Sequence, residues 1–162
     1  MAKRFKEAFG KINEYFSDCY VRLFGGGTAA LKLTDPNDVL GSGIDIEVQP
    51  PGKKLQSLFL LSGGERALTV IALLFALLSY QPSPFCILDE IDAALDEANV
   101  DRFAKFLAAY AESTQFIVIT HRKGTMEAAH VLHGVTMEES GVSKLLSCLL
   151  YTSDAADELD GV

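Results

Sequence analysis

The sequence predicts an α/β fold that contains a parallel pair of strands. An apolar run from Phe85 to Leu88 has the length of a buried strand, a helical pattern of apolar residues follows from Glu97 to Tyr110, and a second apolar run covers Phe116 to Thr120. Short connections from strand to helix to strand indicate parallel pairing across a crossover helix. A long helix through Ser79 is apolar on nearly every side, so we expect it to be buried between this sheet and other helices.

Size and composition are those of one domain without a membrane span. The chain has 162 residues, of which 49% are hydrophobic, which is enough for one core and too little for two ordinary domains. It contains no uncharged apolar run long enough to span a bilayer and no visible signal peptide, so no membrane partner is expected. The three cysteines are widely spaced and form no C-x-x-C pair, which disfavours a disulfide framework or a zinc site and favours the reducing cytoplasm.

The end of the chain has an unusual composition. The segment CLLYTSDAADE, from Cys148 to Glu158, resembles the translation of a sequencing-library adapter, so residues 148–162 are expected to be a non-native tail. This tail holds four acidic residues and no lysine or arginine, so the formal charge of −8 becomes −4 without it. A mildly acidic chain is not expected to bind nucleic acid through a broad basic surface of its own.

Residues 1–24 are expected to form one helix. Apolar side chains recur every three or four positions on one face, at Phe5, Phe9, Ile12, Phe16, Cys19 and Leu23. This heptad-like seam indicates the end of a coiled-coil arm, and a single amphipathic helix packed on its own domain is the alternative, because the segment is too short to separate the two. Gly25-Gly26-Gly27 ends the helix, and it is not a Walker A phosphate loop because no Gly-Lys-Ser/Thr follows it.

A strand pair is predicted between residues 29 and 48. Apolar residues alternate with polar or small ones at Ala29, Leu31 and Leu33, and again at Ile44, Ile46 and Val48, with turn residues between the two runs. This pattern is typical of antiparallel strands with one face in water. Lys53 and Lys54 follow a Pro-Pro-Gly turn and are expected to be solvated, with a contact to phosphate or DNA as the alternative.

The turn Leu61-Ser62-Gly63-Gly64-Glu65 has two interpretations. The first N–H groups of a helix lack internal acceptors and attract phosphate, and glycines allow a ligand to approach the main chain closely. Ser62 and Glu65 also fit the S-x-x-E capping box that begins many ordinary helices. This stretch alone leaves both interpretations open.

Acidic residues and a histidine are expected at the carboxyl edge of the parallel strands. Asp89 and Glu90 directly follow the first strand and His121 follows the second, so the three should lie close together, where open α/β sheets form their active sites. The alternatives are a surface pair of acids that caps a helix and an ordinary histidine at a strand end.

The remaining elements carry less chemical information. A short helix near Thr125 to Ala129, a strand near Val131 to Thr136 and a last strand from about Val142 are expected. His130 and His133 lie in this region with Glu127, but no other feature supports a metal cluster there.

Three motifs in order make the chain similar to a known family. LSGGE at residues 61–65 (the signature turn), CILDEIDAALDEANV at 86–100 and QFIVITHRKGTM at 115–126 resemble the C-terminal half of the ATPase head of bacterial SMC (structural maintenance of chromosomes) proteins. The resemblance covers about residues 5–147. It implies the C-terminal lobe of an ABC-type P-loop ATPase head at residues 25–147, preceded by the end of a coiled-coil arm at residues 1–24.

The resemblance also implies a role for each motif residue in ATP hydrolysis. Asp89 corresponds to the Walker B acid that holds Mg²⁺ through water, Glu90 to the base that orients the attacking water, and His121 to the switch histidine at the γ-phosphate. Asp96 matches the D-loop, which lies along the interface of two heads. Ser62 and Gly64 of the signature turn would face the ATP that the opposite head holds.

The absence of G-x-x-x-x-G-K-S/T from the sequence implies that the site is shared with another segment. In the family, the N-terminal half of the same SMC head carries Walker A, and two heads form a homodimer around two ATP molecules. The further implied partners are a kleisin subunit and DNA, in chromosome condensation and segregation at the cytoplasmic nucleoid. The alternatives are a head fragment of a recombination and repair protein or of a transporter subunit, or a non-catalytic fragment.

Overall fold

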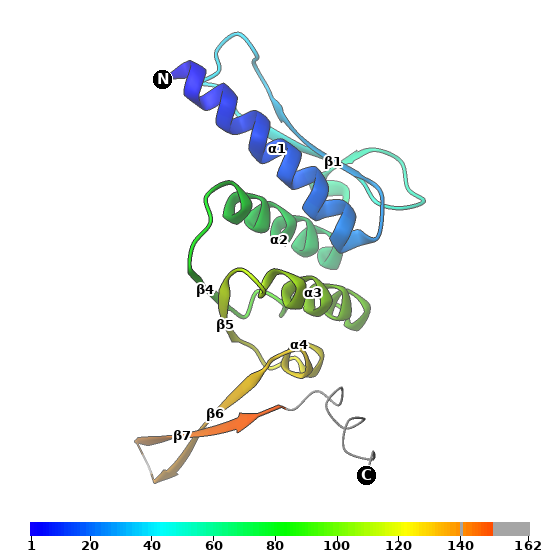
Figure 1. The fold of residues 1–162 in the computed structure, drawn as a ribbon. Helices are drawn as coiled ribbons and strands as arrows, with labels where there is room; N and C mark the ends of the chain where they lie inside the picture. The colour runs from blue at the N-terminus through cyan, green and yellow to red at the C-terminus, as the bar shows by residue number, and fades with distance from the viewer. Residues whose placement is uncertain (140, 151–162) are drawn as a thin grey trace, which may run out of the picture.

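The computed structural model describes residues 1–139 and 141–150, which fold into helices and three small sheets. The elements are α1 (Ala2–Phe24), β1 (Thr28–Leu33), β2 (Ile44–Gln49), β3 (Gln56–Ser57), a 3-10 turn (Leu58–Leu60), α2 (Gly63–Tyr80), β4 (Phe85–Asp89), α3 (Glu97–Tyr110), β5 (Gln115–Ile119), α4 (Lys123–Glu127), β6 (Val131–Glu139) and β7 (Val142–Leu149). Figure 1 shows α1, α2 and α3 as successive layers, with the β6–β7 hairpin beyond α4.

Helix α1 packs its carboxyl half into the core of the same domain. Its buried residues contact α2 and β1, and they are Phe16, Cys19, Tyr20, Leu23 and Phe24. The helix ends at Gly25, whose φ of 71° lies in the left-handed region that glycine adopts without strain. The amphipathic-helix interpretation therefore holds for this half, while Phe5, Phe9 and Ile12 are only half-buried.

The predicted strand pair is present and has a third strand. β1 and β2 are antiparallel, with Leu31 opposite Ile46, and the inward residues Ala29, Leu31 and Val48 are buried. β3 adds to the other edge of β2. The sequence pattern missed β3 because two residues are too short to show an alternation.

Helix α2 is the central core helix, but its predicted burial on all sides was wrong. Its inner face is buried and consists of Leu68, Thr69, Ile71, Ala72, Phe75 and Ala76. On its outer face Val70 is 51% exposed. By length and composition alone α2 could cross a membrane, but this is weak evidence for a membrane span because core helices have the same properties. The inner face of α2 packs on α1 and α3, as in a core helix.

β4 and β5 are parallel, as predicted, with Ile87 opposite Ile117. One face of this pair packs against the core through Cys86, Leu88, Phe116 and Val118. The other face is apolar yet about half exposed, and it presents Phe85, Ile87, Ile117 and Ile119. The prediction of two buried strands was therefore wrong for this face, because the described helices cover only the opposite one.

β6 and β7 form an antiparallel hairpin that is longer than predicted. Leu132 pairs with Cys148 and Val131 with Leu149, so the first two residues of the predicted tail belong to β7. Their place in a strand does not test whether the tail is native. Residues 151–162 lie outside the described residues, so the non-native tail at residues 148–162 remains a prediction. Helix α4 begins two residues earlier than expected, at Lys123.

Candidate functional site

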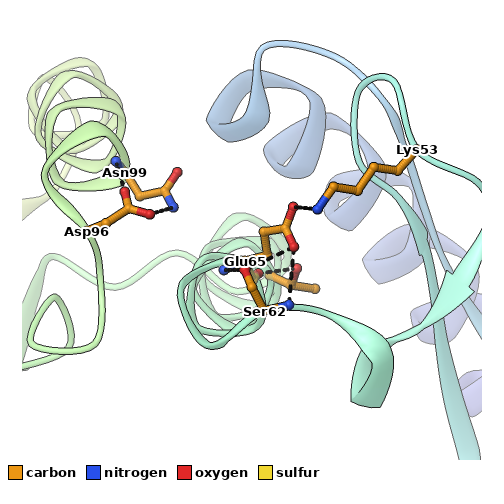
Figure 2. Close-up of polar contacts among 6 residues, drawn as sticks. Lys53, Ser62, Glu65, Asp96 and Asn99 are labelled. Carbon is orange, nitrogen blue, oxygen red and sulfur yellow. Dashed lines mark hydrogen bonds and ion pairs between the residues drawn. The ribbon is translucent and has the colours of Figure 1, made fainter.

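The signature turn is a complete capping box. The Ser62 hydroxyl accepts a hydrogen bond from the Glu65 backbone N–H (3.3 Å), and Glu65 Oε2 accepts one from the Ser62 backbone N–H (3.2 Å). The hydroxyl also donates to Glu65 Oε2 at 3.0 Å, as Figure 2 shows. The capping interpretation is therefore confirmed, and a cap of this kind stabilises a helix by about 1 kcal/mol. Ser62 is still exposed, so capping leaves it accessible to a ligand.

Lys53 joins the signature turn from the loop after β2. Its ammonium donates a hydrogen bond to Glu65 Oε1 at 2.7 Å, and Glu65 is the less exposed partner (17% against 52% for Lys53). The expected solvated turn thus holds for Lys54 and was incomplete for Lys53. Lys53, with the hydrogen bonds from Ser62, holds the pKa of Glu65 below its usual range.

The two glycines of the turn have different surroundings. A Cβ on Gly63 would meet no atom within 4 Å. A Cβ on Gly64 would lie 3.3 Å from Asn99 Nδ2 and 3.4 Å from Asp96 Oδ2, so Gly64 allows α2 to pack closely on the start of α3. Only Gly63 leaves open space from which a ligand can approach the backbone.

Asp96 caps α3 beside the signature turn. Its Oδ1 accepts a hydrogen bond from the Asn99 backbone N–H (2.9 Å) and its Oδ2 one from Asn99 Nδ2 (3.2 Å). Figure 2 shows this pair beside the group of Ser62, Glu65 and Lys53. All five side chains line one open pocket of about 860 Å³, together with Arg102. The tertiary structure therefore brings the predicted D-loop residue to the signature turn of the same chain.

Glu90 and His121 meet at the carboxyl edge of the parallel strands. Asp89 is the last residue of β4 and Glu90 the next, and His121 Nδ1 lies 3.7 Å from Glu90 Oε1. Both side chains are about 60% exposed (62% and 60%), so water screens the attraction between them and the pair adds little stability. Their proximity agrees with the prediction, and their exposure leaves them accessible to a ligand.

The backbone of Glu90 is strained. Its φ of 48° makes it the only non-glycine residue with a positive φ in the described part of the chain. Its N–H donates to the Ile119 carbonyl (2.9 Å) and its carbonyl accepts from the Ala93 N–H (3.1 Å), which ties it to both β5 and the next turn. The left-handed region costs a non-glycine residue about 1–2 kcal/mol, and such strain concentrates at functional sites.

Sequence reasoning missed a buried polar group behind this edge. Asp92 is fully buried, and its Oδ2 accepts hydrogen bonds from the hydroxyls of Thr120 (2.7 Å) and Thr125 (2.5 Å). Arg122 Nη2 donates to the Leu95 carbonyl at 2.8 Å in the same region. The sequence did offer a signal for this group, because Asp92 lies between Ile91 and two alanines. A carboxylate in such an apolar run needs buried hydrogen-bond partners.

His130 precedes the β6–β7 hairpin and His133 lies in β6. His133 Nδ1 makes a 2.7 Å hydrogen bond with the Ser147 hydroxyl. Within residues 1–139 and 141–150, no three His, Cys, Asp or Glu side chains are grouped so that they could hold a metal ion.

This mixed helix and sheet architecture matches solved structures of SMC ATPase heads. It is similar to a chain described under "Structural biochemistry of ATP-driven dimerization and DNA stimulated activation of SMC ATPases", with a TM-score of 0.86 and 40% identity over 91% of this chain and 89% of that one. It is also similar to an SmcHead bound to the C-winged helix domain of ScpA, with a TM-score of 0.78 and 43% identity over 88% of this chain and 43% of that one.

The chain belongs to the family described as RecF/RecN/SMC N terminal domain, which matches residues 11–144. It is 65% identical over 150 residues to the chromosome partition protein Smc of Bacillus subtilis (strain 168). That alignment covers 93% of this chain and 13% of the Bacillus protein, so the chain spans about an eighth of the relative's length.

Proposed function

We propose that this chain is the C-terminal lobe of a bacterial SMC ATPase head and works in ATP-driven chromosome partition. The observation that carries the proposal is the exposed Glu90–His121 pair, 3.7 Å apart at the carboxyl edge of two parallel strands. In phosphoryl transfer the protein mainly orients the attacking water and stabilises charge on the phosphoryl oxygens. Glu90 would orient that water and accept its proton, and His121 would donate a hydrogen bond to the γ-phosphate.

Asp89 fits the metal ion that this chemistry requires. Mg²⁺ in nucleotide sites takes one or two carboxylates and fills its other positions with water and phosphate oxygens, so a large cluster of protein ligands is not needed. Asp89 is exposed at the end of β4, next to Glu90, and can serve as that single carboxylate through a bound water. When bound, the ion would neutralise charge on the β- and γ-phosphates.

The signature turn would contact the ATP held by the opposite head. Ser62 is exposed at the positive end of α2, and Gly63 leaves the backbone open on that side. The Ser62 hydroxyl donates to Glu65 in this structure, and turning it toward a phosphate oxygen would replace that bond. Two heads would then be held together by two shared ATP molecules.

The site needs the N-terminal half of the head, which we propose covers the exposed face of β4 and β5. The sequence contains no Walker A motif to hold the α- and β-phosphates. The exposed apolar side chains of Phe85, Ile87, Ile117 and Ile119 suit a further layer, because soluble proteins rarely leave such a patch uncovered. This chain also corresponds to 43% of one solved SMC head.

The other partners are proposed by likeness to the solved heads. One of them is bound to the C-winged helix domain of ScpA, which supports a kleisin-type partner for this chain. Another is described by ATP-driven dimerization and DNA stimulated activation, which supports a second head and DNA as partners. The amino half of α1, which is exposed apart from its half-buried apolar seam, is proposed to continue into a coiled-coil arm.

Heads assembled from both halves test the roles of the signature turn and the catalytic acid separately. Ser62→Arg should abolish ATP-dependent dimerisation but keep ATP binding, because the long side chain fills the place of the opposite phosphate. Glu90→Gln should keep dimerisation and lower turnover by roughly 10²-fold or more, as when a general base is lost. Size-exclusion chromatography with ATP and Mg²⁺ and a phosphate-release assay read both effects.

Ser113→Arg, at an exposed serine of the loop between α3 and β5, is the control for the added arginine. Normal dimerisation of Ser62→Arg would leave Ser62 with the capping role alone. Turnover of Glu90→Gln at the parental rate would make the two acids a surface pair.

Assembly of the two halves has its own test. The chain alone should neither bind ATP usefully nor hydrolyse it, and both activities should appear when the Walker A half is added. Ile87→Glu should prevent this by placing a charge on the sheet face, whereas Leu40→Glu, at a similarly exposed residue near the β1–β2 turn, should not. Steady turnover by the chain alone, lost in Glu90→Gln, would contradict the proposal.

A further inference from the structure

The buried carboxylate of Asp92 lies between the two segments that carry the proposed catalytic pair. Asp92 follows Glu90 by two residues and is fully buried. Its Oδ2 accepts hydrogen bonds from Thr120, the residue before His121, and from Thr125 in the middle of α4 (2.7 and 2.5 Å). One carboxylate oxygen thus connects the segment after β4 to the segment after β5, and we call this three-residue group the Asp92 clasp.

Two further hydrogen bonds join the same two segments. The Thr120 hydroxyl that donates to Asp92 also accepts a hydrogen bond from the Arg122 backbone N–H at 2.9 Å. Arg122 in turn donates from its side chain to the Leu95 carbonyl (2.8 Å), three residues beyond Asp92. The residues on both sides of His121 are therefore bound to the turn that follows Glu90.

The strained backbone of Glu90 needs such support. A left-handed conformation at a non-glycine residue persists only where its surroundings hold it. The turn after Glu90 is closed by the Ala93 N–H to the Glu90 carbonyl and by the Leu95 N–H to the Asp92 carbonyl (3.1 and 3.0 Å). Asp92 anchors the middle of that turn, so the clasp opposes relaxation of Glu90 away from His121.

Stability alone does not explain an aspartate at this position. Among the described residues Asp92 Oδ1 has no hydrogen-bond partner, although its atom is buried. Burying a carboxylate with an unpaired oxygen lowers the stability of the fold. Replacing such a buried charged group by well-packed apolar side chains often leaves a protein at least as stable. The carboxylate is better explained by the geometry that it imposes on its neighbours.

We propose that Asp92 is a positioning residue for ATP hydrolysis, which acts through Glu90 and His121 by holding their two segments at a fixed separation. The inference rests on the proposed function of that pair. The Asp92 clasp lies behind the exposed edge and not on it, so its loss should affect the alignment of the attacking water more than the binding of ATP. Misplacement of catalytic groups by a fraction of an ångström to 1 Å is enough to slow a reaction strongly.

The test uses heads assembled from both halves and the variant Thr120→Val, which keeps the side-chain shape and removes the hydroxyl. We expect kcat to fall by roughly 10-fold or more, with KM for ATP and ATP-dependent dimerisation within about twofold of the parent. Thr120→Ser should restore kcat because it returns the donor to Asp92. The matched control is Thr114→Val, at a buried threonine before the opposite end of β5.

A double-mutant cycle with His121→Ala separates positioning from general stability. If Thr120 acts through the catalytic pair, Thr120→Val should lower kcat little further once His121 is absent. The proposal would be overturned if the effects of Thr120→Val and His121→Ala on kcat were fully additive. It would also be overturned if both Thr120→Val and Thr125→Val kept the parental kcat, or if Thr120→Ser failed to restore kcat. A parallel loss of kcat, dimerisation and melting temperature would also overturn it, since that result describes a structural role only.

Two further outcomes are separable from these. If Thr120→Val does not fold, Thr125→Val tests the other hydroxyl by the same measurements. If the parent heads do not hydrolyse ATP, or if Glu90→Gln hydrolyses it at the parental rate, the proposed function fails and the role of Asp92 fails with it.

Discussion

The Lys53 ammonium lies 2.7 Å from one carboxylate oxygen of Glu65, and the other oxygen of Glu65 accepts hydrogen bonds from the backbone and the hydroxyl of Ser62. Lys53 belongs to the loop between β2 and β3, whereas Ser62 and Glu65 begin α2 (Figure 2). A single glutamate thus connects the small sheet to the signature turn. The stability of the fold should therefore depend on whether Glu65 is ionised.

Lys53→Met is expected to make stability less sensitive to acid. The pKa of Glu65 is lowered in the folded chain, chiefly by Lys53, so the interaction stabilises the fold at neutral pH and is lost as pH falls through the usual glutamate range to the lowered pKa. The pair is partly exposed, so the loss at neutral pH should be about 1 kcal/mol or less. Melting temperatures of parent and variant between about pH 7 and pH 3 should differ most near neutrality and converge in acid.

The control for that comparison is Lys54→Met at the exposed neighbouring lysine, for which no such convergence is expected. A constant difference between parent and Lys53→Met across the whole pH range would show that packing, and not the charge of Lys53, is responsible.

The two glycines of the signature turn should respond differently to alanine. Gly63→Ala should be neutral or stabilising, by up to about 1 kcal/mol, because the methyl group meets no atom and restricts the unfolded chain. Gly64→Ala should be at least about 0.5 kcal/mol less stable than Gly63→Ala, because its methyl group presses on Asn99 and Asp96. Urea unfolding measures both, and equal stabilities would contradict the close packing of α2 on α3.

In assembled heads Gly63→Ala, the more stable of the two variants, should be the one that impairs function. Gly63→Ala occupies the open side of the turn and should weaken ATP-dependent dimerisation, which size-exclusion chromatography detects. Unchanged dimerisation would mean that no ligand approaches the turn from that side.

Cys19 should be the slowest of the three thiols to react. It is 2% exposed, and burial raises its pKa to about 11, so almost no thiolate forms near pH 8. Cys148 is exposed and Cys86 is half-buried. A colorimetric thiol reagent at pH 8 should modify Cys148 first, Cys86 more slowly and Cys19 only as fast as the chain unfolds. The variant Cys19→Ala should lose the slowest reaction phase and keep the other two. Simultaneous modification of all three thiols would contradict the packing of α1.

Glycine at position 90 should relieve the strain of the left-handed backbone. Glu90→Gly and Glu90→Gln both remove the carboxylate, so the difference in their unfolding free energies reports on φ. Glu90→Gly should be as stable as Glu90→Gln or more stable by up to about 1 kcal/mol, since the relief outweighs the extra freedom of the unfolded chain. Glu97→Gly, in the first turn of α3, should instead cost up to about 1 kcal/mol relative to Glu97→Gln, and the same cost at both positions would argue against strain at Glu90.

Much of the fold and part of the candidate site could be predicted from local patterns. Helix periodicity gave α3 its observed bounds, Glu97–Tyr110, and the short connections predicted the parallel pairing of β4 and β5. The capping box at Ser62 is a contact between residues three apart, which spacing alone can reveal. The meeting of Glu90 and His121 follows from strand order, since both come directly after parallel neighbours.

The sequence by itself therefore determined the class of fold, the order of its longer elements and the strand edge at which the motif residues lie, because these depend on periodicity and on contacts close in the chain. Only the tertiary structure decided that Lys53 binds Glu65, that Gly64 packs on α3, and that Asp92 lies buried between Thr120 and Thr125. It also decided which face of β4 and β5 is exposed. These features arise where segments distant in sequence pack together, and the direction of each side chain there depends on neighbours that no local pattern specifies.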